Sequence, residues 1–134
     1  MKLSRIKEVK EEIELAQLEL ENLRGRLKQI SRPELEELLK RYSPLKSVVE
    51  NLKTQIVDVE RELENLRGEF AESVVTLTRE ILERVKGHSA QKVLILRYCA
   101  GKSFKEICFE LSYSKVNIFR LHQQGVKQFN SAEQ

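Results

Sequence analysis

Tryptophan is absent from this chain, and glycine and proline are scarce, with five and two residues in 134. A β-sandwich or β-barrel needs a turn about every 8–12 residues, and glycine, proline, asparagine or aspartate usually marks those turns. The few glycines and prolines present cannot supply them, and the alternation of strands and helices that builds nucleotide-binding sheets is missing as well. The sequence therefore argues against both an all-β fold and an α/β fold.

The chain also lacks long apolar runs. No stretch of about 18 apolar residues could span a bilayer, so we expect no contact with a membrane. The opening residues, MKLSRIKEVKEE, lack the apolar core of a signal peptide, which predicts a cytoplasmic protein. Cys99 and Cys108 fit a reducing compartment. Their spacing matches no metal motif, so we expect thiols packed in a core.

Signs of catalysis are missing too. The two histidines, His88 and His122, lie far apart without a convincing partner. No glycine-rich phosphate loop, nucleophile elbow or metal-ligand spacing occurs. The many glutamates fall where we expect solvated helix faces. We therefore expect no enzyme activity, no cofactor and no metal.

What the chain does have is charge, at 34% of residues, together with the abundance of Leu, Glu, Lys and Arg that is typical of long helices. The charge is unevenly distributed. Residues 1–87 hold 17 basic and 18 acidic side chains, whereas residues 88–134 hold 7 basic and 3 acidic ones. A basic C-terminal part indicates an anionic partner, most simply a nucleic-acid backbone, and the alternative is an accidental basic surface.

Two apolar stripes with alternating spacings of three and four residues run through the first two thirds, which is the heptad pattern of a coiled coil. The first stripe comprises Ile6, Val9, Ile13, Ala16, Leu20, Leu23, Leu27 and Ile30. The second begins with Leu45, Val49, Leu52, Ile56, Val59, Leu63 and Leu66 and continues to Phe70. After Phe70 two spacings of four follow each other and the stripe widens, which predicts a helix packed in a globular domain from there on.

The segment between the stripes predicts a bend. Ser31 is a candidate cap for a short helix whose first turn contains Pro33, and Ser43-Pro44 repeats this start signal. The two long helices match in length, so they can pair as an antiparallel hairpin within one chain, or alternatively between two chains. In either case we expect apolar surface to remain for a second copy. We therefore predict a homodimer held by the second stripe, Leu45 to Leu66.

The last third predicts a helix-turn-helix. Gly87 stops the long helix, Ser89 caps a short apolar helix over residues 90–100, and Gly101 ends that helix. Ser103 and Glu106 form a capping box, which starts a helix over residues 104–111. Ser112-Tyr113 makes a tight turn, and Ser114 caps the last helix. The expected fold is therefore all-α, with a coiled-coil helical hairpin over residues 1–72 and a helix-turn-helix domain over residues 73–134.

The last helix carries the candidate site. Ile118, Leu121, Val126 and Phe129 are expected to face the core. The opposite face is basic and rich in amides, and residues 114–128 include three basic side chains and no acid. Such a helix suits the major groove of duplex DNA, where Arg and Lys bond guanine and Asn and Gln bond adenine. The predicted DNA-binding residues are Lys115, Val116, Asn117, Phe119, Arg120, Gln123 and Lys127.

Residues 89–129 resemble region 4 of bacterial sigma factors. The matching segments are Ala90–Tyr98, Gly101–Ile107, Leu111–Ser114 and Asn117–Arg120. The helical arm carries no diagnostic motif. The whole chain is similar to small phage and prophage transcriptional regulators of the RinA and ArpU type, and to short streptococcal phage proteins with a comparable C-terminal motif. This resemblance implies a DNA-binding regulator, most simply an activator, in the cytoplasm of a bacterial host. By the same analogy, Lys115, Val116 and Arg120 occupy base-facing positions.

Three positions depart from the sigma pattern. Cys108 replaces a usual alanine, Ser112 replaces a usual glycine in the turn, and Phe119 stands where a polar groove contact is common. The bulky Phe119 leaves a second hypothesis open, in which the surface binds protein. In that case the arm or the helix-turn-helix would grip RNA polymerase or another host protein, such as a defence enzyme that it inhibits.

Overall fold

The computed structural model describes residues 1–132, apart from the side chain of Ser43. Across these residues the chain forms α-helices and one π-helical turn and no strand, which confirms the predicted all-α fold. The last two residues of the predicted C-terminal domain, Glu133 and Gln134, lie outside the described residues. No helix in the described part is long and apolar enough to cross a membrane.

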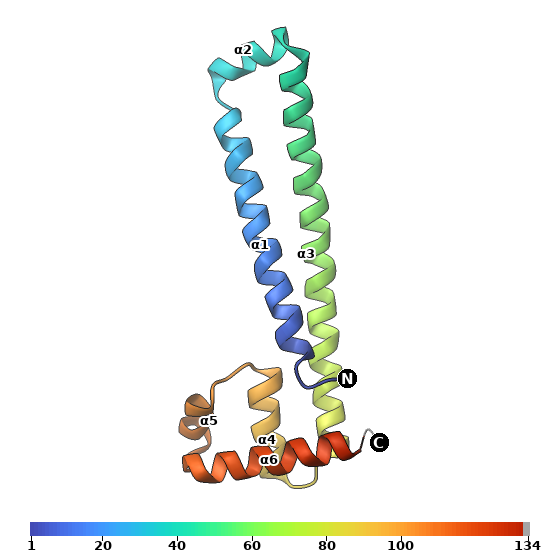
Figure 1. Cartoon of the computed structure of the whole chain (residues 1–134), viewed down its shortest axis with the longest axis vertical. Coiled ribbons are helices and arrows are strands. Elements are labelled where there is room, and N and C mark those ends of the chain that lie inside the picture. The colour runs from blue at the N-terminus through green and yellow to red at the C-terminus, as the bar shows by residue number, and fades with distance from the viewer. Residues whose placement is uncertain (133–134) are drawn as a thin grey trace. The chain divides into compact units, whose positions relative to one another are not determined.

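The helices follow one another in the order shown in Figure 1. Their bounds are α1 (Arg5–Ile30), α2 (Pro33–Arg41), α3 (Ser43–Arg84), α4 (His88–Leu94), the π-helical turn η1 (Ile95–Cys99), α5 (Phe104–Leu111) and α6 (Lys115–Ser131). The chain divides into two compact units, one of residues 10–69 and one of residues 1–9 together with 70–134. The sequence placed a boundary near this one, between residues 72 and 73, but assigned the first nine residues to the helical arm.

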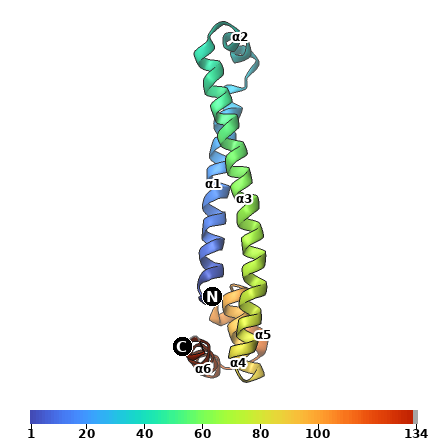
Figure 2. The same cartoon turned by 90° about the vertical axis from the view of Figure 1, so that its right-hand side faces the viewer.

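In the unit of residues 10–69, α1 and α3 run side by side in opposite directions and α2 joins them (Figures 1 and 2). Each helix turns the apolar stripe read from the sequence toward the other, because residues three and four apart share one face of a helix. The buried side chains of this seam are Ala16, Leu20, Leu23, Leu52, Ile56, Val59, Leu63 and Leu66, with Ile13, Leu27 and Ile30 packed against them.

This seam bears on the residues predicted to hold two chains together. Leu52, Ile56, Val59, Leu63 and Leu66 are buried within one chain, Val49 is half-buried, and Leu45 is 38% exposed. Pairing within the chain is therefore the arrangement observed for these stripes. A second copy that left this seam closed would have to use another surface.

The start of α2 differs from the sequence prediction. Its cap residue is Arg32, in extended conformation and without a side-chain cap hydrogen bond, and Pro33 is the first helical residue. Proline favours that first position and disfavours helix in the residue before it, which places the boundary at Arg32 rather than at Ser31. The prediction that Ser31 caps this helix is wrong. Its backbone N–H closes α1 instead, at 2.9 Å from the oxygen of Leu27.

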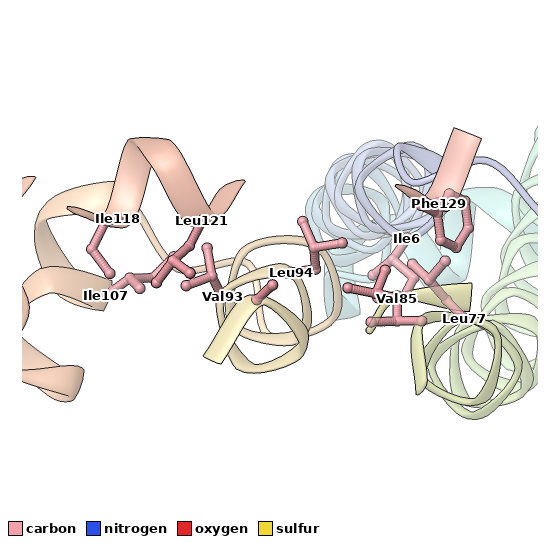
Figure 3. Close-up of a cluster of buried hydrophobic side chains, with 11 residues drawn as sticks. Ile6, Leu77, Val85, Val93, Leu94, Ile107, Ile118, Leu121 and Phe129 are labelled. Carbon is pink, nitrogen blue, oxygen red and sulfur yellow. The ribbon is translucent and has the colours of Figure 1, made fainter. Parts of the chain in front are cut away.

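The other unit surrounds a second apolar core (Figure 3). α3 contributes Leu77, Ile81 and Val85, and the short helices that follow contribute the remaining large side chains. The fully buried residues that close this core are Val93, Leu94, Ile107, Ile118 and Phe129. These residues come from α4, α5 and α6, so one core fixes the three helices to each other and to the end of α3.

Between α3 and α4 the chain turns at Gly87, whose φ of 99° lies in the region that favours glycine. Gly87 is also the cap residue of α4, so the predicted cap at Ser89 is wrong. The Ser89 hydroxyl lies 3.2 Å from the hydroxyl of Tyr113 instead. The side chain of Gln91 donates to the carbonyl of Val85 at 2.8 Å and so satisfies a free acceptor at the end of α3.

The helix predicted over residues 90–100 is two elements. After α4 the backbone widens into η1, where the N–H of Ala100 bonds the oxygen of Ile95 five residues back, at 3.0 Å. Gly101 then ends the segment with a positive φ of 70°, as its residue type predicted. A π-helical turn cannot be recognised from apolar spacing alone, because it inserts one residue into an otherwise continuous helical pattern.

Candidate nucleic-acid interface

Helix α5 begins with the capping box that the sequence predicted. The N–H of Glu106 donates to the hydroxyl of Ser103 at 3.2 Å, and the Glu106 carboxylate accepts from the backbone of Ser103. Ile107 is fully buried, while Phe104, Cys108 and Leu111 are half-buried at the edge of the same core. α5 is therefore locked at its start by hydrogen bonds and along one face by apolar packing.

A three-residue connection joins α5 to α6. Ser112 takes the left-handed conformation, with φ 57° and ψ 36°, which favours glycine. The hydroxyl of Ser114 accepts from the N–H of Asn117 at 3.2 Å and caps α6. The sequence predicted the turn at Ser112-Tyr113 and the cap at Ser114, but not the left-handed conformation of Ser112. The turn and the cap together fix where the first turn of α6 begins.

The inner face of α6 packs against the core. Ile118, Leu121 and Phe129 are buried as predicted, whereas Val126 is half-buried. Gly125 is buried as well, and a Cβ at this position would stand 3.0 Å from Cγ of Leu94 on α4. The missing side chain thus lets α4 and α6 approach closely, which explains a glycine inside a helix where alanine has the better helix propensity.

The outer face of α6 exposes most of the predicted DNA-binding residues. Val116, Arg120, Gln123 and Lys127 follow one another at spacings of four, three and four, and all four are exposed, Val116 to 80%. Lys115 is also exposed, at the first position of the helix. These spacings put the side chains in one line along the helix surface.

Asn117 and Arg120 form a contact within this face. The guanidinium of Arg120 donates to Oδ1 of Asn117 at 2.8 Å, one turn apart on the helix. Asn117 is half-buried and Arg120 is exposed. Asn117 therefore restrains the Arg120 guanidinium on the first two turns of the helix.

Phe119 has a different environment from the rest of the predicted set. Its ring centroid lies 5.0 Å from that of Phe104 on α5, and 39% of the residue remains exposed. The ammonium of Lys115 lies 5.8 Å from the same ring. Phe119 therefore joins α6 to α5, and it leaves an apolar edge beside the polar line.

Behind Phe119 lies an aromatic cluster that the sequence did not predict. Tyr98 Oη lies 2.8 Å from Nε2 of His122, and the His122 ring meets the ring of Phe104 edge-on, with the centroids 5.0 Å apart. The guanidinium of Arg97 lies over the Phe104 ring and donates to the carbonyl of Lys102. Burial, and secondly the positive charge of Arg97, lower the pKa of His122.

The two cysteines and the exposed face of α5 complete this part of the chain. Cys99 and Cys108 are free thiols and half-buried, and burial raises the pKa of Cys99. The described residues include no group of three side chains that could hold a metal ion. On α5, Phe109 is 89% exposed in a shallow hollow of mixed charge, lined also by Lys102, Lys105, Glu106 and Glu110. Phe109 is not among the site residues predicted from the sequence, although its position two residues after buried Ile107 places it on the outer face of a helix.

Comparison of the chain with known proteins gave no match among protein-family models, curated proteins or solved structures.

Proposed function

We propose that this protein is a sequence-specific DNA-binding regulator that inserts α6 into the major groove of duplex DNA. The observation that carries the proposal is the outer face of α6. It is basic and contains no acid, it begins at a capped first turn, and a core fixes the helix that bears it. Helix-turn-helix proteins read DNA with such a helix, while the preceding helix, here α5, crosses the backbone.

The proposed DNA-binding residues fall into two groups, those placed to contact base edges and those placed to contact phosphates. Lys115, Val116 and Asn117 lie in the first turn, which is the part of such a helix that contacts base edges. Arg120 follows one turn later and suits a bidentate bond to guanine. Lys127 lies further along and suits a phosphate. The positive end of the α6 dipole adds attraction for the backbone near Lys115.

The resemblance to sigma region 4 and to small phage regulators supports a role in transcription, most simply as an activator in a bacterial cytoplasm. We propose a homodimer on the DNA, because most soluble oligomers are homo-oligomers with twofold symmetry and such regulators read two half-sites. The half-sites would lie about 10–10.5 base pairs apart, or a multiple of that spacing.

Selection from random duplex oligonucleotides with the purified protein tests this proposal. The proposal expects an enriched motif, and it expects the Arg120→Ala variant to lose or broaden that motif at one position while the fold is retained. Affinity should fall steeply with salt, with a slope of log K against log salt of about −0.9 per neutralised phosphate. No binding to any duplex at low salt would overturn the proposal.

A second candidate function rests on Phe109. An aromatic side chain that is 89% exposed is a candidate anchor for another protein, since aromatic residues dominate the energy of interfaces. In this alternative the α5 face grips RNA polymerase or another host protein. Purified host RNA polymerase should then retain the protein, and the Phe109→Ser variant should release it without loss of helix content. If RNA polymerase retains the natural protein and the Phe109→Ser variant equally, this second function is excluded.

A further inference from the structure

Helix α2 is amphipathic, and its apolar face is only partly covered within the chain. None of its nine residues is buried. On the apolar face, Leu38 and the cap residue Tyr42 are exposed to 41% and 56%, and Leu35 and Leu39 are half-buried. An isolated helix shorter than about 12–15 residues is marginal in water, and packing of an apolar face is what stabilises a short one. The apolar face of α2 is therefore a candidate interface with another surface.

The sequence of α2 has a twofold pattern. From residue 35 it reads Leu-Glu-Glu-Leu and then Leu-Lys-Arg-Tyr. Read from either end, the order is apolar, charged, charged, apolar, and the sign of the charge inverts at the midpoint between Leu38 and Leu39. Such a segment is complementary to a copy of itself turned end for end.

An antiparallel pair of α2 helices satisfies this pattern in a single register. Leu35 then faces Tyr42 of the second copy, and Leu38 faces its Leu39, so apolar residues meet across the axis. In the same register Glu36 and Glu37 come beside Lys40 and Arg41 of the second copy. A parallel pair would instead bring glutamate beside glutamate and base beside base, and like charges in contact disfavour an interface.

We propose that two copies of this chain associate through α2 in an antiparallel, twofold-symmetric contact. The apolar line supplies the attraction, and the flanking charges select the antiparallel orientation and register, because charges at a rim contribute specificity more than affinity. Leu45 and Val48 at the start of α3 are also exposed, to 38% and 47%, and add apolar surface next to the helix. The contact leaves the α1–α3 seam closed. The proposal names the surface of the homodimer and does not depend on DNA binding.

Charge reversal tests the pairing directly, because it leaves the apolar face intact. The double variant Glu36→Lys with Glu37→Lys places basic residues at 36, 37, 40 and 41 and leaves Glu34 as the one acid of α2. The double variant Lys40→Glu with Arg41→Glu makes every charged residue of α2 acidic. Sedimentation velocity of the full chain without DNA, from about 1 µM to about 1 mM, should show a reversible dimer for the natural sequence, since a contact this small gives a modest affinity. Each double variant should raise the dissociation constant at least about tenfold, as like-charge contacts disfavour association.

An equimolar mixture of the two double variants should recover the dimer, because the acidic helix is complementary to the basic one. In the natural charge background, Leu38→Gln should abolish the dimer. Leu18→Gln, at a residue on α1 that is 64% exposed, should leave it unchanged. Circular dichroism should show equal helix content for the variants. A monomer at every concentration, or a dimer that neither the charge variants nor Leu38→Gln affects, would overturn the proposal.

Discussion

Gly125 of α6 lies directly against Leu94 of α4: a Cβ built on Gly125 would stand 3.0 Å from both Cγ and Cδ1 of Leu94. Leu94 is itself fully buried, so its side chain has little room to give way. This contact sets the distance at which the candidate reading helix packs on its own domain. Glycine has a low helix propensity, but the core leaves no room for a side chain at this position.

The Gly125→Ala variant should therefore lose stability. Alanine gains about 1 kcal/mol of helix propensity, but overpacking a closed core costs typically about 1–3 kcal/mol, so we expect a small net loss and a lower thermal midpoint. Gln124→Ala, at the exposed neighbouring position, is the matched control and should be nearly neutral. A more stable Gly125→Ala variant would show that Leu94 can move aside.

Ser112 should be a site of stored strain. Its φ of 57° costs a residue with a Cβ about 1–2 kcal/mol, and glycine avoids that cost. Ser112→Gly should therefore raise the midpoint of urea unfolding, and the β-branched Ser112→Val should lower it. Glycine at exposed Gln124, inside α6, should instead lower the midpoint, because glycine disfavours the interior of a helix.

Substitutions of Ser114 separate the effect of the helix cap on stability from the effect of the start of α6 on DNA binding. Ser114→Ala should destabilise the protein by about 1 kcal/mol, because the N–H of Asn117 loses its acceptor. Ser114→Asp should retain the cap and the stability, yet it places a negative charge at the start of the proposed reading helix. Fluorescence anisotropy with labelled duplex DNA should then show weaker binding for a fully folded Ser114→Asp variant. Undiminished affinity would place the start of α6 away from the DNA.

His122 should make stability depend on pH. Its pKa is lowered from the ordinary value of 6.5 in the folded chain, so the unfolded chain binds the proton more readily. Stability is then full above about pH 6.5 and falls as the pH drops from there through the folded pKa. Tyr98, Phe104 and Arg97 surround the ring, and none of them is an acid that could stabilise its charged form.

The measurement is the thermal midpoint at pH 7.5 and at pH 5.5. The loss between these values should be smaller for His122→Gln, whose amide can still meet the Tyr98 hydroxyl, than for the natural protein. The His88→Gln variant, at an exposed residue, should retain the full loss. An equal loss in all three proteins would show that His122 does not contribute to it.

Local signals in the sequence predicted much of this structure. The capping box at Ser103, the cap at Ser114 and the stop at Gly101 each depend on a side chain or backbone choice within a few residues, so residue type is enough to find them. The two apolar stripes likewise predicted the buried seam, because spacings of three and four residues keep side chains on one face of a helix.

The structural features that could not be predicted depend on contacts between residues far apart in the sequence. Ser31 and Ser89 are good caps by type, yet Pro33 and Gly87 determine where those helices begin. Whether the stripes pair within or between chains depends on packing as well, because the heptad spacing and the predicted bend fit both arrangements. The π-helical turn and the contact of Phe119 with Phe104 depend on how α4, α5 and α6 pack, which the spacing of apolar residues does not specify.

The most direct test of the account compares Arg120→Ala with Lys127→Ala on a selected duplex and on variants of it with one base pair changed. A bidentate base contact is worth about 1–3 kcal/mol of discrimination. The Arg120→Ala variant should therefore bind two duplexes almost equally: the selected one and the one changed at the base pair that Arg120 contacts. Lys127→Ala should weaken binding to all duplexes by a similar factor and reduce the salt slope by about 1. If both variants keep the affinity and sequence preference of the natural protein while the fold is intact, α6 does not read DNA.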